Sequence, residues 1–346
     1  MQHKLLLGVA SLVFCTYAHT EAEIQYKKAN KIAIFYNPQF LLHDTGAQHP
    51  ERAERLIGVI EHLKHHFAQS LIWPSFQPAS KEALALIHTP QYLQLVENEI
   101  SALGKNQRVQ LSTGDTTISP STLAVAKLAA GAAIAASDAV MAEQVNGAFA
   151  LTRPPGHHAS AARGMGFCVY NNVAIAARHL QQQYGLKRIL IVDFDVHHGN
   201  GTQDIFYADN SVFYFSIHQS PLYPGTGRAT ETGVGKGLGY TLNVELPAGA
   251  GDDALMKAIE TQLKPAMQKF KPEFILVSAG FDSHRNDPLG NLQYTDQGYA
   301  NVAKALTAIA QQNGHRRVVY LLEGGYNPAN ITSAVSRMLN TMLETP

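Results

Sequence analysis

Acidic and histidine side chains close two apolar runs of the chain, and their spacing suits a metal ion. The run RILIVDFDVHHGNG carries Asp193, Asp195, His197 and His198. Residues two apart on an extended chain point to the same side, so Asp195 and His197 face one ion while Asp193 supports them from beneath. A second run, FILVSAGFD, ends in Asp282. Two carboxylates and one imidazole leave coordination positions open for water and substrate, which is typical of a catalytic zinc site.

An alternative for Asp282 alone is a polar strand end that caps the following helix. The whole D-x-D-x-H-H-G run argues against a purely structural role, because burying three ionisable groups together is costly without a metal or partners. Arginases bind two manganese ions and need D-x-H-x-D and a later D-x-D. Here Gly199 takes the fifth position of the first run, and His284 follows Asp282 by two. The sequence therefore favours a mononuclear site.

Two further motifs place proton-transfer groups after strand-like runs. In LTRPPGHHA, the Pro-Pro-Gly turn fixes the approach of His157 and His158, whose imidazoles titrate near neutrality. In LLEGGYNP, two glycines allow a tight turn that brings the Tyr326 phenol to the metal site, where it donates a hydrogen bond to a developing oxyanion. A surface location is the alternative for an isolated histidine pair or a loop tyrosine. The shared position after strands favours the catalytic interpretation.

The elements that must position these residues alternate between strand and helix. Strands are expected at residues 31–36, 147–152, 188–193, 211–217, 273–279 and 317–322, which are apolar and rich in β-branched or aromatic residues. Helices are expected at residues 121–145, 172–184, 252–270 and 295–313. This alternation predicts a single α/β domain with a mainly parallel central sheet flanked by helices. Ligands of such sheets bind beyond the carboxyl ends of the strands, where every motif above falls.

Composition excludes some classes of function. The 346 residues contain 27 Lys+Arg and 27 Asp+Glu, so the formal charge is zero, and no basic footprint of a nucleic-acid-binding protein is present. The 45% hydrophobic content is enough for a sizeable core. The two cysteines, Cys15 and Cys168, do not make a disulfide framework, and Cys168 is expected to be a small buried hydrophobe.

The N-terminus resembles a secretory signal. A short polar start precedes the apolar run 5–15, and a cleavage site is plausible near Ala18 or Ala22. We therefore expect a signal peptide at residues 1–22, a catalytic domain at 30–343, no membrane span in the mature chain, and export from a bacterium to the periplasm or beyond. A buried first helix and a cytoplasmic location are the alternatives.

Taken together, the motifs resemble the class II branch of the histone deacetylase family. The matching segments are RPPGHHA, GFCVYNNVAIAA, DFDVHHGNGTQ, FSIHQSPLYPGTG, VSAGFDSHRNDPLG and LEGGYN, in the order of the family, and they span roughly residues 30 to 341. The resemblance implies the arginase/deacetylase α/β fold and zinc-dependent hydrolysis of an acetyl-lysine amide.

The same resemblance implies three cation sites. Zinc is assigned to Asp195, His197 and Asp282. A monovalent cation, usually potassium, is assigned to Asp193, Asp195, His197 and Ser216, partly through backbone carbonyls. A second such ion is implied near Phe206, Asp209, Val212 and Tyr240. The zinc ligand set also suits iron(II).

By analogy with the family, the two histidines have different partners. His157 pairs with Asp193, which favours its charged form, while His158 pairs with the neutral Asn200. His158 is therefore the expected base that takes a proton from water and later protonates the leaving amine, with His157 as electrostatic support. Tyr326 is expected to hold the tetrahedral oxyanion; some class II members carry histidine there and are poor deacetylases.

Substrate selection is expected at the channel. Gly166, Phe167 and Tyr223 match positions that line the narrow channel of the family and enclose a lysine stem. Polyamine-selective relatives place a glutamate at the position of Leu289, so leucine favours an acetylated lysine in a protein or peptide. A deacetylase of acetylpolyamines or other N-acyl amines is the second interpretation, and a non-catalytic binding protein is the third. The oligomeric state is left open.

Overall fold

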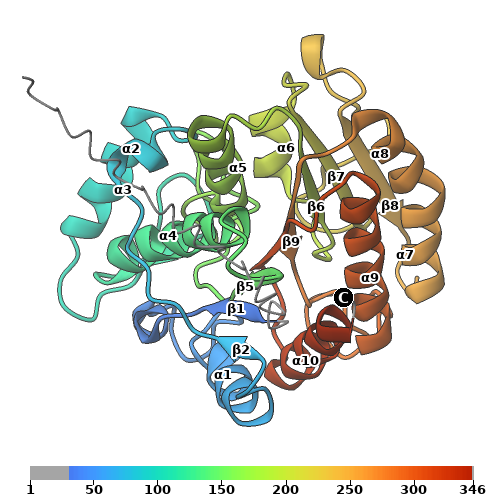
Figure 1. Cartoon of the computed structure of the whole chain (residues 1–346). Helices are drawn as coiled ribbons and strands as arrows, with labels where there is room; N and C mark the ends of the chain where they lie inside the picture. The colour runs from blue at the N-terminus through green and yellow to red at the C-terminus, as the bar shows by residue number, and fades with distance from the viewer. Residues whose placement is uncertain (1–30, 345–346) are drawn as a thin grey trace, which may run out of the picture.

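A parallel sheet forms the centre of the molecule. The computed structural model describes residues 31–344, so the expected signal peptide at 1–22, with Cys15, lies outside the described residues. The sheet has eight strands in the order β2-β1-β5-β10-β9-β6-β7-β8 (Figure 1), and every neighbouring pair is parallel. The strands are β1 (Ile32–Phe35), β2 (Leu71–Ile72), β5 (Gly147–Ala150), β6 (Ile189–Asp193), β7 (Val212–Gln219), β8 (Thr241–Leu246), β9 (Phe274–Ala279) and β10 (Val318–Leu322).

All six predicted strands are present, and the structure adds β2 and β8 at the two edges. The predicted strands were found because both of their faces are buried, which gives near-continuous apolar runs. β8 reads TLNVEL and exposes Glu245, so its pattern is weaker. A small antiparallel pair, β3 (Val109–Gln110) and β4 (Thr117–Ile118), lies outside the central sheet.

The predicted helices are present with one change. They are α4 (Thr122–Met141), α5 (Asn172–Tyr184) and α9 (Asp296–Gln312). The stretch expected at 252–270 divides into α7 (Asp252–Ala258), a π-helical turn (Ile259–Leu263) and α8 (Lys264–Phe270). Pro265 stands at the start of α8. Because proline has no N–H to donate, it breaks the regular hydrogen-bond ladder at this point.

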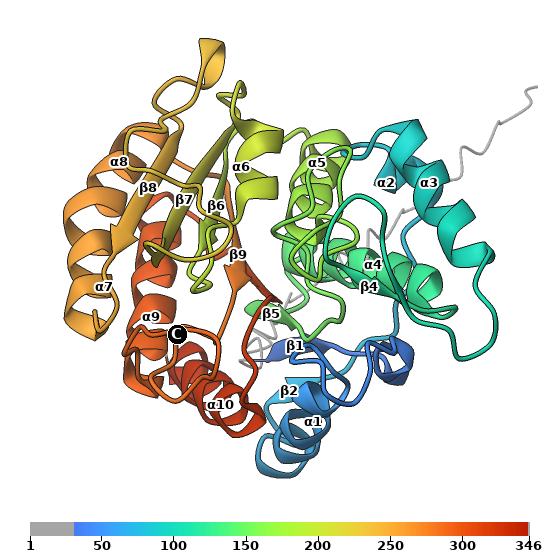
Figure 2. The same cartoon turned by 180° about the vertical axis from the view of Figure 1, so that it is seen from behind.

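Helices cover both faces of the sheet. α4 and α5 pack together on one face, and α9 packs on the other with α1 (Glu54–His66) and α10 (Pro328–Glu344) (Figures 1 and 2). The remaining helices are α2 (Lys81–Leu84), α3 (Pro90–Ser101) and α6 (Asn200–Phe206), with two short 3-10 turns at Pro38–Leu42 and Gly235–Gly237. Within the described residues, α4 alone is long and apolar enough to cross a membrane, but most of it is buried against β1, β5 and α5.

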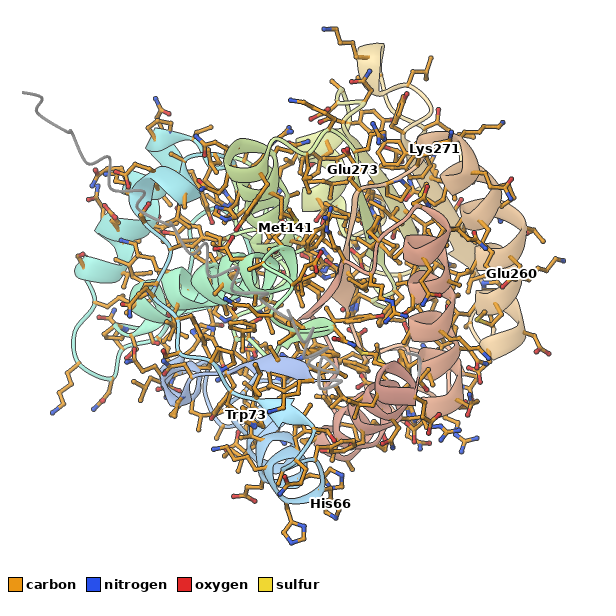
Figure 3. All side chains as sticks on the ribbon, viewed as in Figure 1. His66, Trp73, Met141, Glu260, Lys271 and Glu273 are labelled. Atoms are coloured by element: carbon orange, nitrogen blue, oxygen red, sulfur yellow. The ribbon has the colours of Figure 1, made fainter. Side chains whose placement is uncertain are left out.

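The core between the sheet and its helices is mainly apolar. Glu260 and His66 point outward from their helices (Figure 3), whereas a continuous apolar cluster fills the space between the sheet and its helices. Four adjacent strands, β5, β10, β9 and β6, end at the same edge of the sheet, since all are parallel and in register. The segments that follow them carry the histidine pair, the tyrosine and the metal-site residues, so the topology gathers all the motifs at one edge.

Candidate active site and metal centre

Asp195, His197 and Asp282 converge at the ends of β6 and β9. One ligand atom from each lies within 4.8 Å of the others, and no further group of three such side chains is present in residues 31–344. His197 Nδ1 lies 3.0 Å from Asp195 Oδ1 and 3.2 Å from Asp282 Oδ2. Both carboxylates are fully buried, and the imidazole is 13% exposed. The three residues selected from strand spacing therefore form one compact donor group.

The surroundings of this group fit a cation. Asp282 Oδ2 is buried, and the partner that it has among the described residues is His197 Nδ1, another candidate ligand, at 3.2 Å. Asp282 Oδ1 accepts from the N–H of Val196 at 2.9 Å. A Cβ on Gly324 would lie 1.9 Å from Asp282 Oδ2, and a Cβ on Gly280 would lie 2.1 Å from Asp195 Oδ2. A buried carboxylate oxygen whose partner is a second candidate ligand, with glycine backbone beside it, is a position that a metal ion satisfies.

Gly199 and His284 stand at the two positions where a second metal would need carboxylates. Gly199 carries no ligand, and a Cβ there would lie 2.1 Å from Asp193 Oδ2, so an aspartate would not fit without rearrangement. His284 is directed toward Asp296, with 3.4 Å between its Nε2 and the carboxylate oxygen Oδ1. Within the described residues, a second group of carboxylates beside the first is absent. The described residues therefore offer one group of ligands that could hold a metal ion.

The triad carries strongly perturbed protonation equilibria. Burial disfavours the charged form of His197, but hydrogen bonds to Asp195 and Asp282 outweigh it and raise the pKa of His197 to about 10. Burial and the neighbouring Asp195 raise the pKa of Asp282 to about 7. Without a metal, a proton on His197 thus neutralises part of the carboxylate charge. A metal ion must displace that proton, so metal binding at this site releases protons.

The two histidines of the Pro-Pro-Gly turn lie beside the triad, in unlike environments. His157 Nδ1 is 3.0 Å from Asp193 Oδ2, and its Nε2 is 3.9 Å from Asp195 Oδ1. His158 Nδ1 is 2.8 Å from the amide oxygen of Asn200. Burial lowers the pKa of both rings, but Asp193 and Asp195 reverse this and hold the pKa of His157 well above its usual value.

Burial lowers the pKa of His158, and the nearby His157 and His197 lower it further, well below its usual value. His158 is therefore neutral near pH 7, with Nδ1 directed to Asn200 Oδ1. An Nδ1–H donated to that amide oxygen leaves Nε2 with a free lone pair. Its ring centre lies 6.0 Å from that of His197. A neutral imidazole with a free acceptor nitrogen beside the metal centre is able to take a proton from water.

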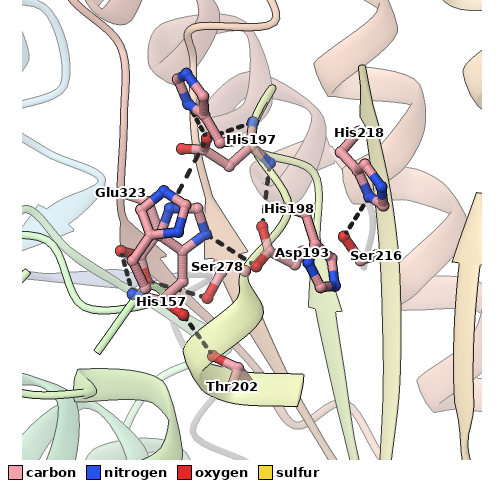
Figure 4. A network of polar contacts seen from close by, with 12 residues as sticks. His157, Asp193, His197, His198, Thr202, Ser216, His218, Ser278 and Glu323 are labelled. Carbon is pink, nitrogen blue, oxygen red and sulfur yellow. Dashed lines mark hydrogen bonds and ion pairs between the residues drawn. The ribbon is translucent and has the colours of Figure 1, made fainter. Parts of the chain in front are cut away.

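A buried carboxylate behind the histidine turn fixes its backbone. Glu323, directly after β10, accepts hydrogen bonds from the N–H groups of Gly156 and His157 at 2.6 and 3.1 Å, and from the Ser278 hydroxyl at 3.0 Å (Figure 4). Burial raises the pKa of Glu323 to about 7. Figure 4 also shows His157 directed toward Asp193, while His198 lies on the far side with His218.

His198 does not face the metal centre. Its ring nitrogens lie 2.8 Å from the Thr226 hydroxyl and 3.0 Å from Gln203 Oε1. Burial, with the neighbouring His218, lowers the pKa of His198 to about 3. His198 is thus a buried neutral residue held by hydrogen bonds, which separates its role from that of His197.

Tyr326 lies in the turn after β10 and is held at its backbone. Its N–H donates to Asp287 Oδ2 at 2.7 Å, and its ring packs 5.0 Å from the guanidinium carbon of Arg55. Burial and the nearby Asp282 raise the pKa of the phenol well above its usual value. The hydroxyl stays protonated at neutral pH and remains a hydrogen-bond donor.

The predicted channel residues border the same region. The Phe167 ring lies 6.1 Å from that of Tyr326, and the Tyr223 ring lies 5.3 Å from that of His158. Gly166 has a φ of +56°, and a Cβ there would meet His158 at 2.2 Å, so only glycine fits. Leu289 is half-buried in the loop after Asp282, and its N–H donates to Asp287, the residue that also holds Tyr326.

The residues predicted for monovalent cations are close in two groups. Asp193 and Ser216 are partners in the β6–β7 register, and the Ser216 hydroxyl lies 2.9 Å from His218 Nδ1. Phe206, Asp209, Val212 and Tyr240 surround the beginning of β7. The Asp209 carboxylate contacts Ser211 and Arg178. Cys168 is buried and free, as expected for a small hydrophobe.

Sequence reasoning missed several buried charges around the site. Glu51 precedes α1, and Arg55 lies in its first turn. Arg153 precedes the Pro-Pro-Gly turn, and Glu323 precedes the Gly-Gly-Tyr turn. Each adjoins a recognised motif or lies in the segment HPERAER, but nothing in a local pattern shows that such a charge is buried. Their partners are distant in sequence, so only the fold reveals the contacts.

Comparison with known proteins agrees with this geometry. Residues 49–342 match the family model described as the histone deacetylase domain. The chain is 42% identical over 311 residues to "Histone deacetylase 10, chloroplastic" of Oryza sativa subsp. japonica, covering 86% of this chain and 70% of that protein. It is 41% identical over 315 residues to "Polyamine deacetylase HDAC10" of Homo sapiens, covering 88% of this chain and 46% of that protein.

Among solved structures, the HD domain of HDA15 superposes with a TM-score of 0.85 and 35% sequence identity, covering 91% of this chain and 89% of that one. The likeness therefore extends over nearly the whole described chain and includes the eight-stranded sheet that carries the metal centre. The family model, the relatives and the fold lead to one assignment, namely that this chain is a hydrolase of the histone deacetylase family.

Proposed function

We propose that the protein is a zinc-dependent deacetylase that hydrolyses the acetyl-lysine amide and releases acetate and a free amine. The observation that carries the proposal is the pairing of a three-ligand metal centre with a neutral, buried His158 at its side. Zinc suits one imidazole and two carboxylates with positions left open, and when bound it polarises a carbonyl and activates water.

The protein residues then have separate roles. His158 takes the proton of the attacking water, because it is neutral and hydrogen-bonded to Asn200. The Tyr326 hydroxyl donates a hydrogen bond to the oxyanion as it develops, since burial keeps the phenol protonated. His158 returns its proton to the leaving amine. His157, held charged by Asp193, stabilises negative charge at the site.

The monovalent cation is a further part of the proposal. We expect potassium beside Asp193, Asp195, His197 and Ser216, since Asp193 and Ser216 are register partners on β6 and β7. We expect a second ion near Phe206, Asp209, Val212 and Tyr240. We also propose a catalytic domain at 30–343, which contains the family match over residues 49–342. Export after removal of residues 1–22 is a separate proposal that is based on the apolar run at the N-terminus.

The substrate class follows from the channel. Leu289 is uncharged and half-buried near the Tyr326 turn, so it offers no attraction to a second amine of a polyamine. Phe167 and Tyr223 present aromatic surfaces beside the site, which suit the methylene stem of a lysine. An acetylpolyamine is the second candidate, because one relative carries the name polyamine deacetylase.

A side-by-side assay separates these candidates. The purified mature chain is given an acetyl-lysine peptide and acetylputrescine, and acetate release is measured with and without a chelator. We expect faster turnover of the peptide and loss of both activities with the chelator. Faster turnover of acetylputrescine would favour the second candidate, while activity on neither substrate would count against the proposal.

A further inference from the structure

A buried carboxylate joins two turns of the site, which are the histidine turn (residues 154–158) and the tyrosine turn (residues 323–326). Glu51 is fully buried and lies between the guanidinium groups of Arg55 and Arg153. Its Oε1 accepts from Arg55 Nη1 at 3.0 Å and from Arg153 Nε at 2.5 Å, while its Oε2 accepts from Arg153 Nη2 at 2.8 Å. Burial disfavours the ionised carboxyl, but the arginines outweigh it and keep the pKa of Glu51 below its usual value. One carboxylate thus holds two charged groups that come from distant parts of the chain.

Arg55 reaches from this carboxylate to the tyrosine turn. Its Nε donates to the Gly325 carbonyl at 2.5 Å, and its Nη2 donates to the Glu323 carbonyl. The guanidinium group also lies 5.0 Å from the centre of the Tyr326 ring. The planar guanidinium group of Arg55 therefore contacts two carbonyls and the ring of the tyrosine turn, and its fork geometry allows all these contacts at once.

Arg153 reaches from the same carboxylate to the histidine turn. It directly precedes the Pro154-Pro155-Gly156 turn that leads into His157 and His158. Its Nη1 donates to the Phe40 carbonyl at 3.0 Å, and its Nη2 donates to the His43 carbonyl at 3.1 Å. The start of the histidine turn is thus fastened to the segment that carries Glu51.

We propose that Glu51 is a positioning residue that sets the Tyr326 hydroxyl relative to the histidine pair, acting through Arg55 on one turn and Arg153 on the other. The proposal rests on the proposed deacetylase function. None of the three residues forms a hydrogen bond or ion pair with Asp195, His197 or Asp282. Glu51 acts through the two arginines, and each arginine acts through the turn that it holds. Because a misplacement of about 1 Å costs roughly a hundredfold in rate, a rigid link between the turns matters for catalysis.

Lysine variants separately test the contacts of Arg55 with the tyrosine turn and those of Arg153 with the histidine turn. Arg55→Lys and Arg153→Lys each keep the positive charge beside Glu51 but lose the fork that holds several carbonyls. Both changes are made in the full chain and in a Tyr326→Phe background, and kcat and KM are measured with an acetyl-lysine peptide. Arg108→Lys, at the exposed Arg108–Asp44 pair, is the matched control. Thermal unfolding and metal content show whether each variant remains folded and loaded.

Loss of the Tyr326 hydroxyl should change the effect of Arg55→Lys on kcat but not the effect of Arg153→Lys. Arg55→Lys should lower kcat about tenfold while KM changes little, and in the Tyr326→Phe background it should cost less than about twofold, because contacting sites are not additive. Arg153→Lys should lower kcat by a similar factor in both backgrounds. Glu51→Gln should lower kcat by about the product of the two fold-changes. An Arg55→Lys cost that is equal in both backgrounds, or absent in both, would overturn the proposal.

A structural readout is independent of activity. In crystal structures, Arg55→Lys should displace Tyr326 while the His157–Asp193 contact of the wild-type chain remains. An unmoved Tyr326 would contradict the positioning role, including in a chain that proves inactive. Absence of activity in the wild-type chain would count against the deacetylase function alone.

Discussion

His157 and His158 are neighbours in the chain, yet their surroundings separate their charges. An ionised partner, Asp193, holds the pKa of His157 high and keeps it charged, whereas burial and the nearby His157 and His197 lower the pKa of His158 and keep it neutral beside the uncharged Asn200. Only a neutral imidazole accepts a proton, so the two histidines have different roles because of their surroundings and not because of the residue type.

The histidine roles give a prediction at the residue scale. His158→Ala should lower kcat by about 10²–10⁴, the usual contribution of a general base, and His157→Ala should have the smaller effect. Steady-state assays on an acetyl-lysine peptide measure both variants, with thermal unfolding to check that each is folded. A larger loss for His157→Ala would assign the base to His157 instead.

Residue types and spacing were enough to predict that Asp195, His197 and Asp282 come together, since a two-residue repeat at a strand end and one later aspartate converge at a single point. The same reasoning missed Glu51 and Glu323. Glu51 meets Arg153, 102 residues away, and its partner Arg55 holds a carbonyl 270 residues away. Contacts across such separations depend on the packing of whole elements and leave no local pattern.

At the scale of elements, the turns after β9 and β10 provide the space for the metal. Gly280 directly follows β9, and Gly324 is the second residue after β10. The carboxylates of Asp195 and Asp282 lie where a side chain at Gly280 or Gly324 would point. The Gly324 N–H also donates to Asp195 Oδ2 at 2.8 Å. The Gly-Gly-Tyr motif was predicted as a tight turn for Tyr326; its first glycine also leaves room for the ligands.

A glycine substitution tests this arrangement. Gly324→Ala would bring a Cβ to within 1.9 Å of Asp282 Oδ2, so we expect loss of most bound metal and of activity. The control is Gly58→Ala in α1, where a Cβ meets nothing within 4 Å and a helix gains about 0.5–1 kcal/mol. Metal content and thermal unfolding measure both. Full metal occupancy in Gly324→Ala would show that the turn tolerates a side chain.

Elements buried on both faces were predicted well, and the peripheral ones were not. β6 and β9 are continuous apolar runs, whereas β8 lies at the sheet edge and α1 mixes charged, histidine and apolar residues. The division of the 252–270 helix by a π-helical turn also could not be read from periodicity, because the apolar spacing continues through Pro265.

At the scale of the whole molecule, several neutral histidines are part of the core. His88 is 1% exposed, and its Nε2 accepts from the N–H of Asn171 at 3.0 Å between the rings of Tyr92 and Tyr170. Burial lowers the pKa of His88 to about 4 from an ordinary value of 6.5. The unfolded chain therefore binds a proton that the folded chain refuses between these two pH values.

This difference predicts how stability depends on pH. The contribution of His88 is complete above pH 6.5 and is lost as the pH falls toward about 4, by roughly 2–3 kcal/mol. In His88→Gln, whose side-chain oxygen still accepts from Asn171, this loss is absent. Between pH 7.5 and 4, the wild-type chain should therefore lose roughly 2–3 kcal/mol of unfolding free energy relative to His88→Gln, as measured by denaturant titrations. A constant difference between the two chains would show that His88 is not buried in its neutral form.

The account as a whole depends on a single metal ion held by Asp195, His197 and Asp282. Stepwise addition of zinc to the chelator-stripped full chain, with acetyl-lysine hydrolysis recorded at each step, tests this most directly. The geometry predicts no activity without metal and a plateau at one equivalent per chain. Activity that persists in the stripped protein, or that rises until two equivalents are bound, would contradict it.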